Sequence, residues 1–337
     1  MAGSGGAHLR PNEAASVLRV EDLRVEFPAR DGRVVQAVSG LSFDLLPGET
    51  VGLVGESGCG KSSAARAVMQ LPRPSGGSVI LGDVDLTQLD GERLRRVRSR
   101  MQLIFQDPIS SLNPRRRVSE IVAEPLEIWG TGNAASRREQ VEEVLEAVGL
   151  DPAIAGPKRP HEFSGGQCQR ISIARAVVGE PTVLICDEPV SALDVSVQAQ
   201  ILNLLEDMKA RFGLSMIFIA HDLAVVRSVS DRVAVMYLGK LCEVGAPERI
   251  YARPAHPYTD ALLRAVPIPD PAVRPHREPL AGDVPSPLDP PSGCRFRTRC
   301  PRAAPRCASE EPQVREVEAG QFVACHYPLV GAQATAA

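Results

Sequence analysis

The sequence predicts an α/β protein with a parallel sheet at its centre, and three observations favour this class. A short apolar strand at residues 50–54 leads directly into a glycine-rich loop and an apolar-periodic helix at residues 64–71. Two further apolar runs, at residues 183–186 and 216–220, have the composition of parallel strands covered on both faces. Apolar side chains at helical spacing lie between those runs, so strand, helix and strand follow one another as in an α/β unit.

The length and charge of the chain exclude several classes of protein. Its 337 residues carry 38 Lys and Arg against 41 Asp and Glu, a net charge of −3 that does not favour nucleic-acid binding through bulk charge. No apolar run reaches the roughly 18 residues of a membrane-spanning helix, and the N-terminus lacks the apolar stretch of a secretory signal. We therefore expect the chain to stay in the cytoplasm, with its eight cysteines as thiols or metal ligands rather than disulfides.

Shifts in residue pattern divide the chain into segments. Residues 1–16 are small and polar and are expected to form a disordered leader. Residues 17–27 and 41–45 contain the alternating apolar positions typical of strands, whereas residues 107–178 look helical. Nine prolines predict an extended linker over residues 266–291, and a cysteine-bearing tail follows at residues 292–330.

Apolar stripes mark two helices. One stripe falls at helical spacing within residues 141–148, and Gly149 follows where a C-terminal cap would lie. The other stripe runs over residues 197–212, between the two apolar runs. Both stripes predict helices that bury one face.

The loop at residues 55–62 matches the pattern G-x-x-x-x-G-K-[ST] in its required strand–loop–helix setting. Its glycines allow backbone N–H groups to surround phosphates, and the helix N-terminus adds a positive dipole end. Lys61 is expected to reach the β- and γ-phosphates, and the Ser62 hydroxyl to bind Mg²⁺. The alternative is a glycine-rich turn that holds Lys and Ser by chance. Because pattern and setting agree, the loop predicts a nucleotide-phosphate site.

The second half of this site is predicted where the run at residues 183–186 ends in Asp187 and Glu188. The carboxyl ends of parallel strands meet at one edge of a sheet, where ligands bind. Asp187 is expected to hold Mg²⁺ through the coordination shell of the ion. Glu188 is expected to polarise the attacking water as a general base. Buried strands often end in acidic residues, so this pair indicates hydrolysis only together with the loop.

Four further motifs complete the pattern. They are Gln106 after residues 103–105, the run Ser164-Gly165-Gly166-Gln167, the run Ser191-Ala192-Leu193-Asp194, and His221 after the run at residues 216–220. With the loop and the Asp-Glu pair, they resemble in order the landmarks of ATP-binding-cassette (ABC) ATPases over about residues 17–265. The resemblance implies a P-loop NTPase fold of the ABC type. This fold has a RecA-like α/β core, an N-terminal antiparallel β region and an inserted helical subdomain, here at about residues 107–178, to which this chain adds a small cysteine-rich C-terminal extension.

The same resemblance assigns roles to individual residues. It implies ATP contacts from Phe27, Gly55, Ser57, Gly58, Gly60, Lys61, Ser62, Ser63, Ser164, Gly166, Gln167 and Asp194. Mg²⁺ would be bound by Ser62, Gln106 and Asp187, and catalysis would rest on Glu188, His221, Gln106 and Lys61. ATP lies between two cassettes in this family, so Ser164 and Gly166 would face the γ-phosphate bound by the partner.

Some of these assignments have plainer alternatives. Phe27, implied as the aromatic that stacks on adenine, has the alternative of an ordinary strand or core residue. His221 has the alternative of a plain cap or core histidine. The sequence departs from the family pattern at Phe163, where leucine is common, and at Cys168, where a basic residue is common. The second departure puts in doubt the positive charge near the partner's phosphate.

Two stretches resemble the oligopeptide/dipeptide importer branch of the family: residues 105–115 (FQDPISSLNPR), and residues 256–263 ahead of the proline-rich linker. This implies an ATP-hydrolysing subunit at the cytoplasmic face of the membrane. Its partners would be a second, non-identical cassette, two permease subunits and, indirectly, an extracytoplasmic peptide-binding protein. No residue of this chain is expected to contact the cargo, so the resemblance alone assigns it. Nickel or another small solute is therefore the alternative cargo.

Three other functions are weighed against this one. The first is nucleic-acid binding, suggested by five arginines between residues 93 and 100. No aromatic residues that could stack on bases lie among them, so a solvent-exposed helix face is favoured instead. A soluble ABC ATPase of DNA repair or translation usually carries two cassettes or inserted domains. A regulatory subunit that senses metal or redox state through the tail is the third alternative.

The tail holds four of the eight cysteines with the spacing C-x5-C-x6-C-x17-C. They are Cys294, Cys300, Cys307 and Cys325. Four thiolates can hold a tetrahedral zinc ion or a [4Fe–4S] cluster. The spacing lacks tight C-x2-C pairs, five nearby arginines would offset the charge of a cluster, and importer cassettes with a similar tail carry a [4Fe–4S] cluster. The sequence therefore favours an iron–sulfur cluster, with zinc or no metal as alternatives and His326 as a weaker candidate ligand.

Overall fold

The computed structural model describes residues 5–11, 16–265 and 282–331. They divide into two compact units. The first unit comprises residues up to 46, residues 50–88 and residues from 220 onward; the second comprises residues 47–49 and 89–219. Most of the predicted proline-rich linker, residues 266–281, lies outside the described residues.

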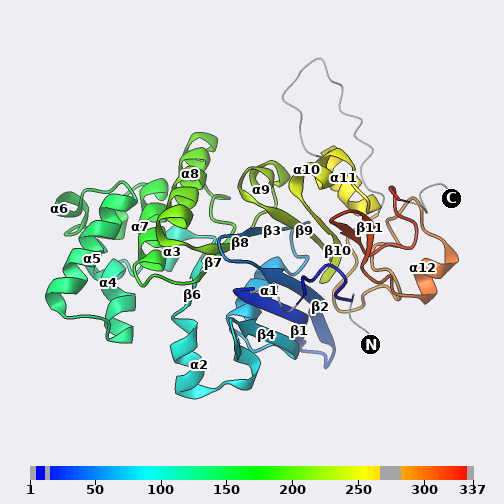
Figure 1. The fold of residues 1–337 in the computed structure, drawn as a ribbon, viewed down its shortest axis with the longest axis horizontal. Coiled ribbons are helices and arrows are strands. Elements are labelled where there is room, and N and C mark those ends of the chain that lie inside the picture. Colours follow the sequence, from blue (N-terminus) through cyan, green and yellow to red (C-terminus); the bar gives the residue numbers. More distant parts are fainter. Residues whose placement is uncertain (1–4, 12–15, 266–281, 332–337) are drawn as a thin grey trace, which may run out of the picture. The chain divides into compact units, whose positions relative to one another are not determined.

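An antiparallel sheet is formed by the N-terminal part of the first unit, drawn in blue and cyan in Figure 1. Its strands are β1 (Leu18–Pro28), β2 (Val34–Leu45), β4 (Gly76–Leu81) and β5 (Val84–Asp85), in the order β2-β1-β4-β5, and a 3₁₀ turn follows at Leu86–Gln88. Leu23 of β1 lies opposite Leu41 of β2, and both are buried. The strands predicted at residues 17–27 and 41–45 are thus confirmed, although β2 begins earlier than predicted, at Val34.

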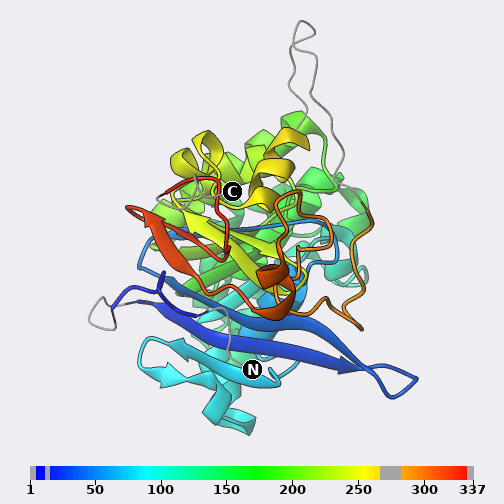
Figure 2. The same ribbon diagram turned by 90° about the vertical axis from the view of Figure 1, so that its right-hand side faces the viewer.

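A second set of strands in the first unit carries the glycine-rich loop. It comprises β3 (Thr50–Val54), β9 (Arg232–Tyr237), β10 (Lys240–Gly245), β12 (Gln321–Val323) and β11 (Arg315–Glu318). β3 runs parallel to β9, whereas β10 pairs antiparallel with β9 and with β12, and β12 with β11. Figure 2 shows the red C-terminal strands beside the yellow strand β10. The tail therefore adds strands to the sheet that holds β3.

Short helices complete the first unit. They are α1 (Lys61–Val68), α9 (Leu223–Val229), α10 (Pro247–Ala252), α11 (Pro257–Ala265) and α12 (Pro305–Ser309). α1 packs against β1 and β2, and α10 and α11 pack against β10. Over the described ranges of the whole chain, no helix is both long enough and apolar enough to cross a membrane.

Part of the segment predicted as a disordered leader packs on β2. His8 is buried, and its Nε2 lies 2.7 Å from the Ser42 carbonyl oxygen. Arg10 forms an ion pair with the buried Asp44 at 3.1 Å. In each contact the two residues are 34 positions apart in the sequence, so the composition of residues 1–16 does not predict them.

The second unit contains three parallel strands, β6 (Met101–Ile104), β7 (Val183–Asp187) and β8 (Ser215–Ile219), with β7 between the other two. All residues of β7 and β8 are buried, which confirms the prediction from their continuous apolar runs.

The helical segments of the second unit follow in chain order. They are α2 (Gly91–Arg98), α3 (Pro108–Ser111), α4 (Val118–Trp129), α5 (Ala134–Ala147), α6 (Pro152–Ala155), a 3₁₀ turn (Pro160–Glu162), α7 (Gly165–Val177) and α8 (Val195–Phe212). α4, α5 and α6 contact one another and lie together in Figure 1, and α7 packs against α3, α4, α5 and α8.

Candidate nucleotide-binding site

The glycine-rich loop connects β3 to α1, and two of its glycines are required by close approach of other backbone. Gly55 has a φ of 155°, and a Cβ at this position would lie 2.2 Å from the carbonyl oxygen of Met236. Gly60 has a φ of 105°, and a Cβ there would lie 2.1 Å from the carbonyl oxygen of Ala37. Any other residue at either position would displace a neighbouring strand, so the loop can be built only from glycines there.

The loop surrounds the ammonium group of Lys61. Its Nζ donates hydrogen bonds to the carbonyl oxygens of Gly55 at 2.8 Å and Glu56 at 3.1 Å, and the residue is only 4% exposed. The predicted contact residues Ser57 and Gly58 are exposed, whereas Ser62 and Ser63 are half-buried in the first turn of α1. The structure thus places Lys61 within the loop, at the N-terminus of α1.

The first unit also contains Phe27 and His221. Phe27 lies near the end of β1, opposite Val35, and is 36% exposed, so it is not a core residue. His221 is exposed directly before α9, whose N-cap Asp222 accepts a hydrogen bond from the Ala224 N–H at 2.7 Å. Both side chains are accessible to a ligand.

In the second unit, the ends of β6 and β7 bring together two of the predicted catalytic residues. Gln106 Nε2 donates a hydrogen bond to Glu188 Oε2 at 2.9 Å. Glu188 has a φ of 50°, and its backbone N–H donates to the Ile219 carbonyl oxygen at 3.0 Å. Asp187 is buried at the end of β7. The carboxylate that would accept a proton is therefore held by an amide side chain from the adjoining strand end.

The run Ser164–Gln167 begins α7 and forms a reciprocal cap. The Gln167 N–H donates to Ser164 Oγ at 3.3 Å, and the Ser164 N–H donates to Gln167 Oε1 at 3.0 Å. A Cβ at Gly166 would lie 2.7 Å from Val197 Cγ1 of α8, so a larger residue would require the Val197 side chain to move. Asp194, exposed at the start of α8, accepts backbone hydrogen bonds from two N–H groups of the first turn.

Cys168, at which the sequence departs from the family pattern, faces the interior of the second unit. It is buried, and its Sγ lies 3.5 Å from the Pro160 carbonyl oxygen. Burial raises the pKa of this thiol. The residue therefore adds no charge to the exposed start of α7.

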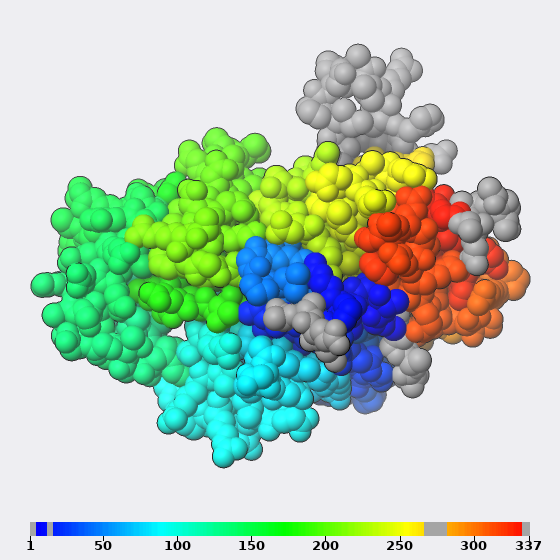
Figure 3. Space-filling view, in the orientation of Figure 1, coloured from blue at the N-terminus to red at the C-terminus, as the bar shows by residue number. Residues whose placement is uncertain are grey.

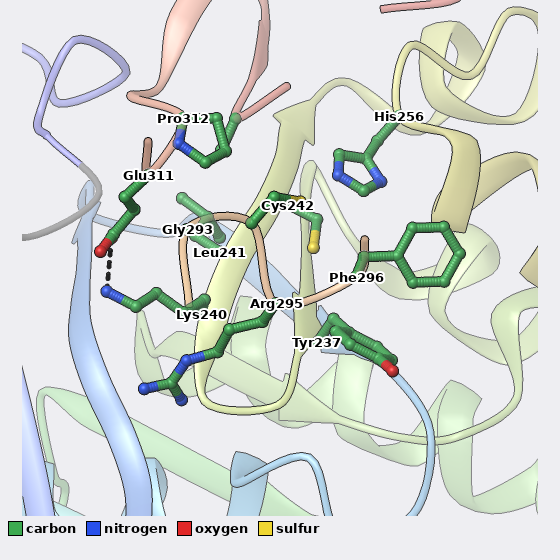
Figure 4. A pocket seen from close by; sticks show the side chains of 12 residues that line it. Tyr237, Lys240, Leu241, Cys242, His256, Gly293, Arg295, Phe296, Glu311 and Pro312 are labelled. Carbon is green, nitrogen blue, oxygen red and sulfur yellow. Dashed lines mark hydrogen bonds and ion pairs between the residues drawn. The ribbon is translucent and has the colours of Figure 1, made fainter. Parts of the chain in front are cut away.

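The four tail cysteines lie close enough to influence one another. The Cys294 N–H donates to the Cys307 carbonyl oxygen at 2.8 Å. Burial raises the pKa of Cys294 to about 11 and that of Cys325 to about 12, and the neighbouring tail thiols, Cys300 among them, add to both shifts. Burial also raises the pKa of Cys242 on β10, and Cys294 and Cys325 raise it further. Cys242, which no sequence motif marks, lines the same pocket as Cys294, and Figure 4 shows it in that pocket.

The donor set of the tail restricts which metal group it fits. Thiolates bound to one zinc ion at about 2.3 Å lie within about 4 Å of one another. Among the described residues, no group of three or more His, Cys, Asp or Glu side chains is placed to hold a metal ion. Two of the five arginines expected to offset a cluster's charge bind carboxylates instead: Arg299 pairs with Glu56 and Arg306 with Glu310. In the part of the tail that the structure describes, the thiols thus form no ready-made site, either for a zinc ion or for an iron–sulfur cluster.

Comparisons with known proteins place this geometry in a family. The sequence matches the family described as "ABC transporter" over residues 38–191, and "Oligopeptide/dipeptide transporter, C-terminal region" over residues 242–307. It is 48% identical over 320 residues to the oligopeptide transport ATP-binding protein AppF of Bacillus subtilis, covering 92% of this chain and 97% of AppF. It is 50% identical over 307 residues to the oligopeptide transport ATP-binding protein OppF of Escherichia coli, covering 88% of this chain and 92% of OppF.

Solved structures agree with these sequence matches. CbiO1 of Clostridium perfringens, part of the ABC transporter complex CbiONQ, has a TM-score of 0.63 at 28% identity over 71% of this chain and 92% of CbiO1. A dimeric ATP-binding cassette bound to ADP and Pi has a TM-score of 0.62 at 25% identity over 68% of this chain and 98% of that cassette. The fold is thus that of an ABC cassette ATPase with mixed α/β sheets. Since relatives of nearly its full length share about half of its residues, the chain belongs to the ABC transporter family, in the branch with the oligopeptide/dipeptide transporter C-terminal region.

Proposed function

We propose that this chain is the ATP-hydrolysing, nucleotide-binding subunit that powers import of di- and oligopeptides through a membrane ABC importer. One observation carries the proposal: a cassette with every ABC landmark, including the Gln106–Glu188 hydrogen bond, is joined in one chain to the oligopeptide-transporter C-terminal region. AppF and OppF, which match across both parts, are oligopeptide transport ATP-binding proteins.

The proposed ATP site begins with the loop. Lys61 and the loop N–H groups bind the β- and γ-phosphates, and the exposed ring of Phe27 stacks on the adenine. Ser62, Gln106 and Asp187 offer the hydroxyl, amide and carboxylate oxygens that suit Mg²⁺. When bound, Mg²⁺ offsets the charge that develops on the phosphates.

Hydrolysis is proposed to rest on a water molecule that Glu188 deprotonates. Gln106 fixes the carboxylate through its hydrogen bond, so that the carboxylate does not need to reorient during the reaction. Lys61 and His221 stabilise the negative charge of the γ-phosphate. The attacking water approaches in line with the bond that breaks.

The complete machine is proposed to need partners. Ser164, Gly166, Gln167 and Asp194, at the starts of α7 and α8, face ATP held by a second, non-identical cassette. ATP binding closes the pair, and the helices within residues 107–178, taken as the inserted helical subdomain, transmit closure to two permease subunits at the cytoplasmic face of the membrane. Hydrolysis resets the complex, and an extracytoplasmic binding protein delivers the peptide.

The Glu188→Gln variant tests the hydrolytic role. We expect it to bind ATP normally, to accumulate as an ATP-bound cassette dimer, and to lose at least about a hundredfold in turnover, because the amide cannot accept the proton. Binding and turnover are measured on the chain co-purified in detergent with its permeases and partner cassette. Undiminished turnover would contradict the role, and failure to co-purify with any permease would favour the soluble ABC ATPase.

The cargo is tested by uptake into vesicles that contain the assembled importer. We expect ATP-dependent uptake of labelled di- and oligopeptides. Uptake of nickel or another small solute in place of peptides would assign the chain to that variant of the branch.

A [4Fe–4S] cluster on Cys294, Cys300, Cys307 and Cys325 is proposed as a structural group of the tail. The support comes from the sequence, in which four thiols that could each bind one iron fall within the tail. Iron, sulfide and zinc are measured in protein purified without oxygen, with a Cys→Ser variant at each position as control. About four irons and four sulfides per chain, lost in each variant, would support the cluster; one zinc, or no metal, would contradict it.

A further inference from the structure

The carboxylate of Glu56 lies in the phosphate loop and is held by a side chain from the cysteine-bearing tail. Arg299 donates two hydrogen bonds to it, from Nη1 to Oε2 at 2.7 Å and from Nη2 to Oε1 at 3.1 Å. The Arg299 side chain is 7% exposed and the Glu56 side chain 26%. A two-pronged, largely buried pair of this kind is stronger and more directional than a surface ion pair.

Aromatic residues fix the direction of Arg299. Its guanidinium lies over the Tyr237 ring, 5.8 Å from the centroid. Tyr258 packs edge-on against Tyr237, and its hydroxyl accepts a hydrogen bond from the Glu56 backbone N–H at 2.8 Å. Phe296 of the tail packs against both tyrosines, and Figure 4 shows it close to Tyr237. One cluster therefore holds both the backbone and the side chain of this loop residue.

A second arginine of the tail secures the other end of the loop. Arg295 donates hydrogen bonds to the Leu238 carbonyl oxygen and to Gln36 Oε1. The next residue, Gly239, donates its N–H to the Cys59 carbonyl oxygen in the loop at 2.8 Å. Figure 3 shows the orange and red tail packed against the yellow segment that carries α10 and α11. The tail thus reaches the loop along two separate routes.

The charge of Glu56 matters because a nucleotide brings several negative charges to this loop. Like charges repel strongly in a partly buried site, where water screens them little. An unpaired Glu56 carboxylate would therefore weaken phosphate binding. Arg299 cancels that charge, and both of its Nη atoms donate to Glu56.

We propose that Arg299 is a positioning residue for nucleotide binding, which neutralises Glu56 and holds the phosphate loop in the conformation that accepts ATP. The inference rests on the proposed function in one respect, that residues 55–63 bind the phosphates of ATP. It makes the cysteine-bearing tail a part of the nucleotide site, although the two residues are 243 positions apart.

A double-mutant cycle tests this proposal through the Kd for MgATP of the purified full chain, measured by displacement of a fluorescent ATP analogue. Arg299→Gln is expected to raise the Kd roughly tenfold, because it leaves Glu56 unpaired. Glu56→Gln leaves Arg299 as an unpaired cation and is expected to tighten binding about threefold. The double variant is expected to return to within about threefold of wild type.

Salt distinguishes this role from simple docking of the tail. The loss in Arg299→Gln arises from charge repulsion, so it is expected to shrink as ionic strength rises. The proposal is overturned if adding Glu56→Gln to the Arg299→Gln variant does not restore its ATP affinity. It is also overturned if higher salt does not reduce the loss of affinity in Arg299→Gln; in either case Arg299 only anchors the tail. Should Arg299→Gln not fold, Arg299→Lys keeps the charge but not the two-pronged geometry. It is expected to weaken binding about threefold, and wild-type binding there would equally overturn the proposal.

Two further variants serve as controls. Arg306→Gln removes an exposed pair with Glu310 in the same tail and is expected to leave the Kd unchanged. Lys61→Ala tests the loop itself. If Lys61→Ala binds ATP as wild type does, the proposed phosphate site is wrong, and this outcome is separate from any result at Arg299.

Discussion

His256 is buried where α11 begins, and its surroundings favour the neutral ring. Nδ1 accepts a hydrogen bond from the Tyr258 N–H at 3.0 Å, which requires that nitrogen to carry no proton. The backbone N–H of His256 donates to the buried carboxylate of Glu243 at 2.9 Å. Burial lowers the pKa of His256 to about 3. The folded protein therefore resists protonation of a residue that the unfolded chain protonates readily.

This histidine is expected to make the protein less stable in mild acid. The unfolded state takes up a proton as the pH falls through about 6.5, whereas the folded state does not, so about 2 kcal/mol of stability is lost between pH 7.5 and pH 5. In His256→Asn, the amide oxygen can still accept the hydrogen bond but does not titrate, so this part of the loss disappears. The change in urea unfolding midpoint with pH measures the effect, with His161→Asn at an exposed site as control. An equal pH dependence in wild type and His256→Asn would contradict the assignment.

Single residues differ in how far the sequence predicts their contacts. Glu188 follows a predicted strand, but Gln106 was identified only as a landmark of the family, and the structure adds the 2.9 Å hydrogen bond between their side chains. Nothing local pairs Arg299 with Glu56, because their contact depends on how the tail folds back onto the loop. Cys242 was missed for the same reason, since a lone buried cysteine on a strand looks like any small apolar residue.

At the start of α7, one side chain carries two roles. Its first turn is stabilised by the reciprocal Ser164–Gln167 cap, and the same Ser164 hydroxyl is proposed to face the partner's ATP. The cap and the proposed ligand contact therefore draw on one side chain. Substitutions that keep one role and remove the other can separate them.

Ser164→Ala and Ser164→Asn make that separation. Ser164→Ala is expected to cost about 1 kcal/mol of stability, whereas Ser164→Asn keeps a good cap and is expected to be close to wild type in stability. Both are expected to slow ATP hydrolysis roughly tenfold or more, because neither supplies the hydroxyl. Thermal unfolding and steady-state turnover measure the two effects. Wild-type turnover in Ser164→Asn would show that Ser164 only caps the helix.

Elements were predictable where a local pattern determines them. The continuous apolar runs became β7 and β8, and the stripe within residues 141–148 became the last turns of α5, with Gly149 at a φ of 75° just beyond the helix. β11 and β12 could not be read from the sequence. They are four and three residues long, too short for alternation to stand out, and they form because β10 offers an unpaired edge.

At the scale of the whole chain, the tail completes the first unit. β12 pairs with β10, and Gln321 at its start donates to Glu243 Oε1 at 2.8 Å. Val323 packs with Ala255 and Val330 in one apolar cluster. Without these residues, β10 would be an open edge strand and its buried carboxylate would lose a partner.

A chain that ends at residue 291 is therefore expected to associate with itself. Open edge strands pair with other chains, so size-exclusion chromatography should show soluble aggregates or oligomers. A chain that ends at residue 331 keeps β11 and β12 and serves as the matched control. A monomeric, stable chain ending at residue 291 would show that the tail is not needed to cover the edge.

The pairing of β3 with β9 also bears on how the protein is made. β9 is synthesised about 180 residues after β3, which at ribosomal speeds of roughly 5–20 residues per second is a delay on the order of 10–40 s. The strands of the second unit leave the ribosome within that interval. In the nascent chain, β3 and the glycine-rich loop are therefore present before β9 is available to pair with β3. During synthesis, the proposed phosphate-binding loop is therefore translated early, but its neighbouring strand follows only much later.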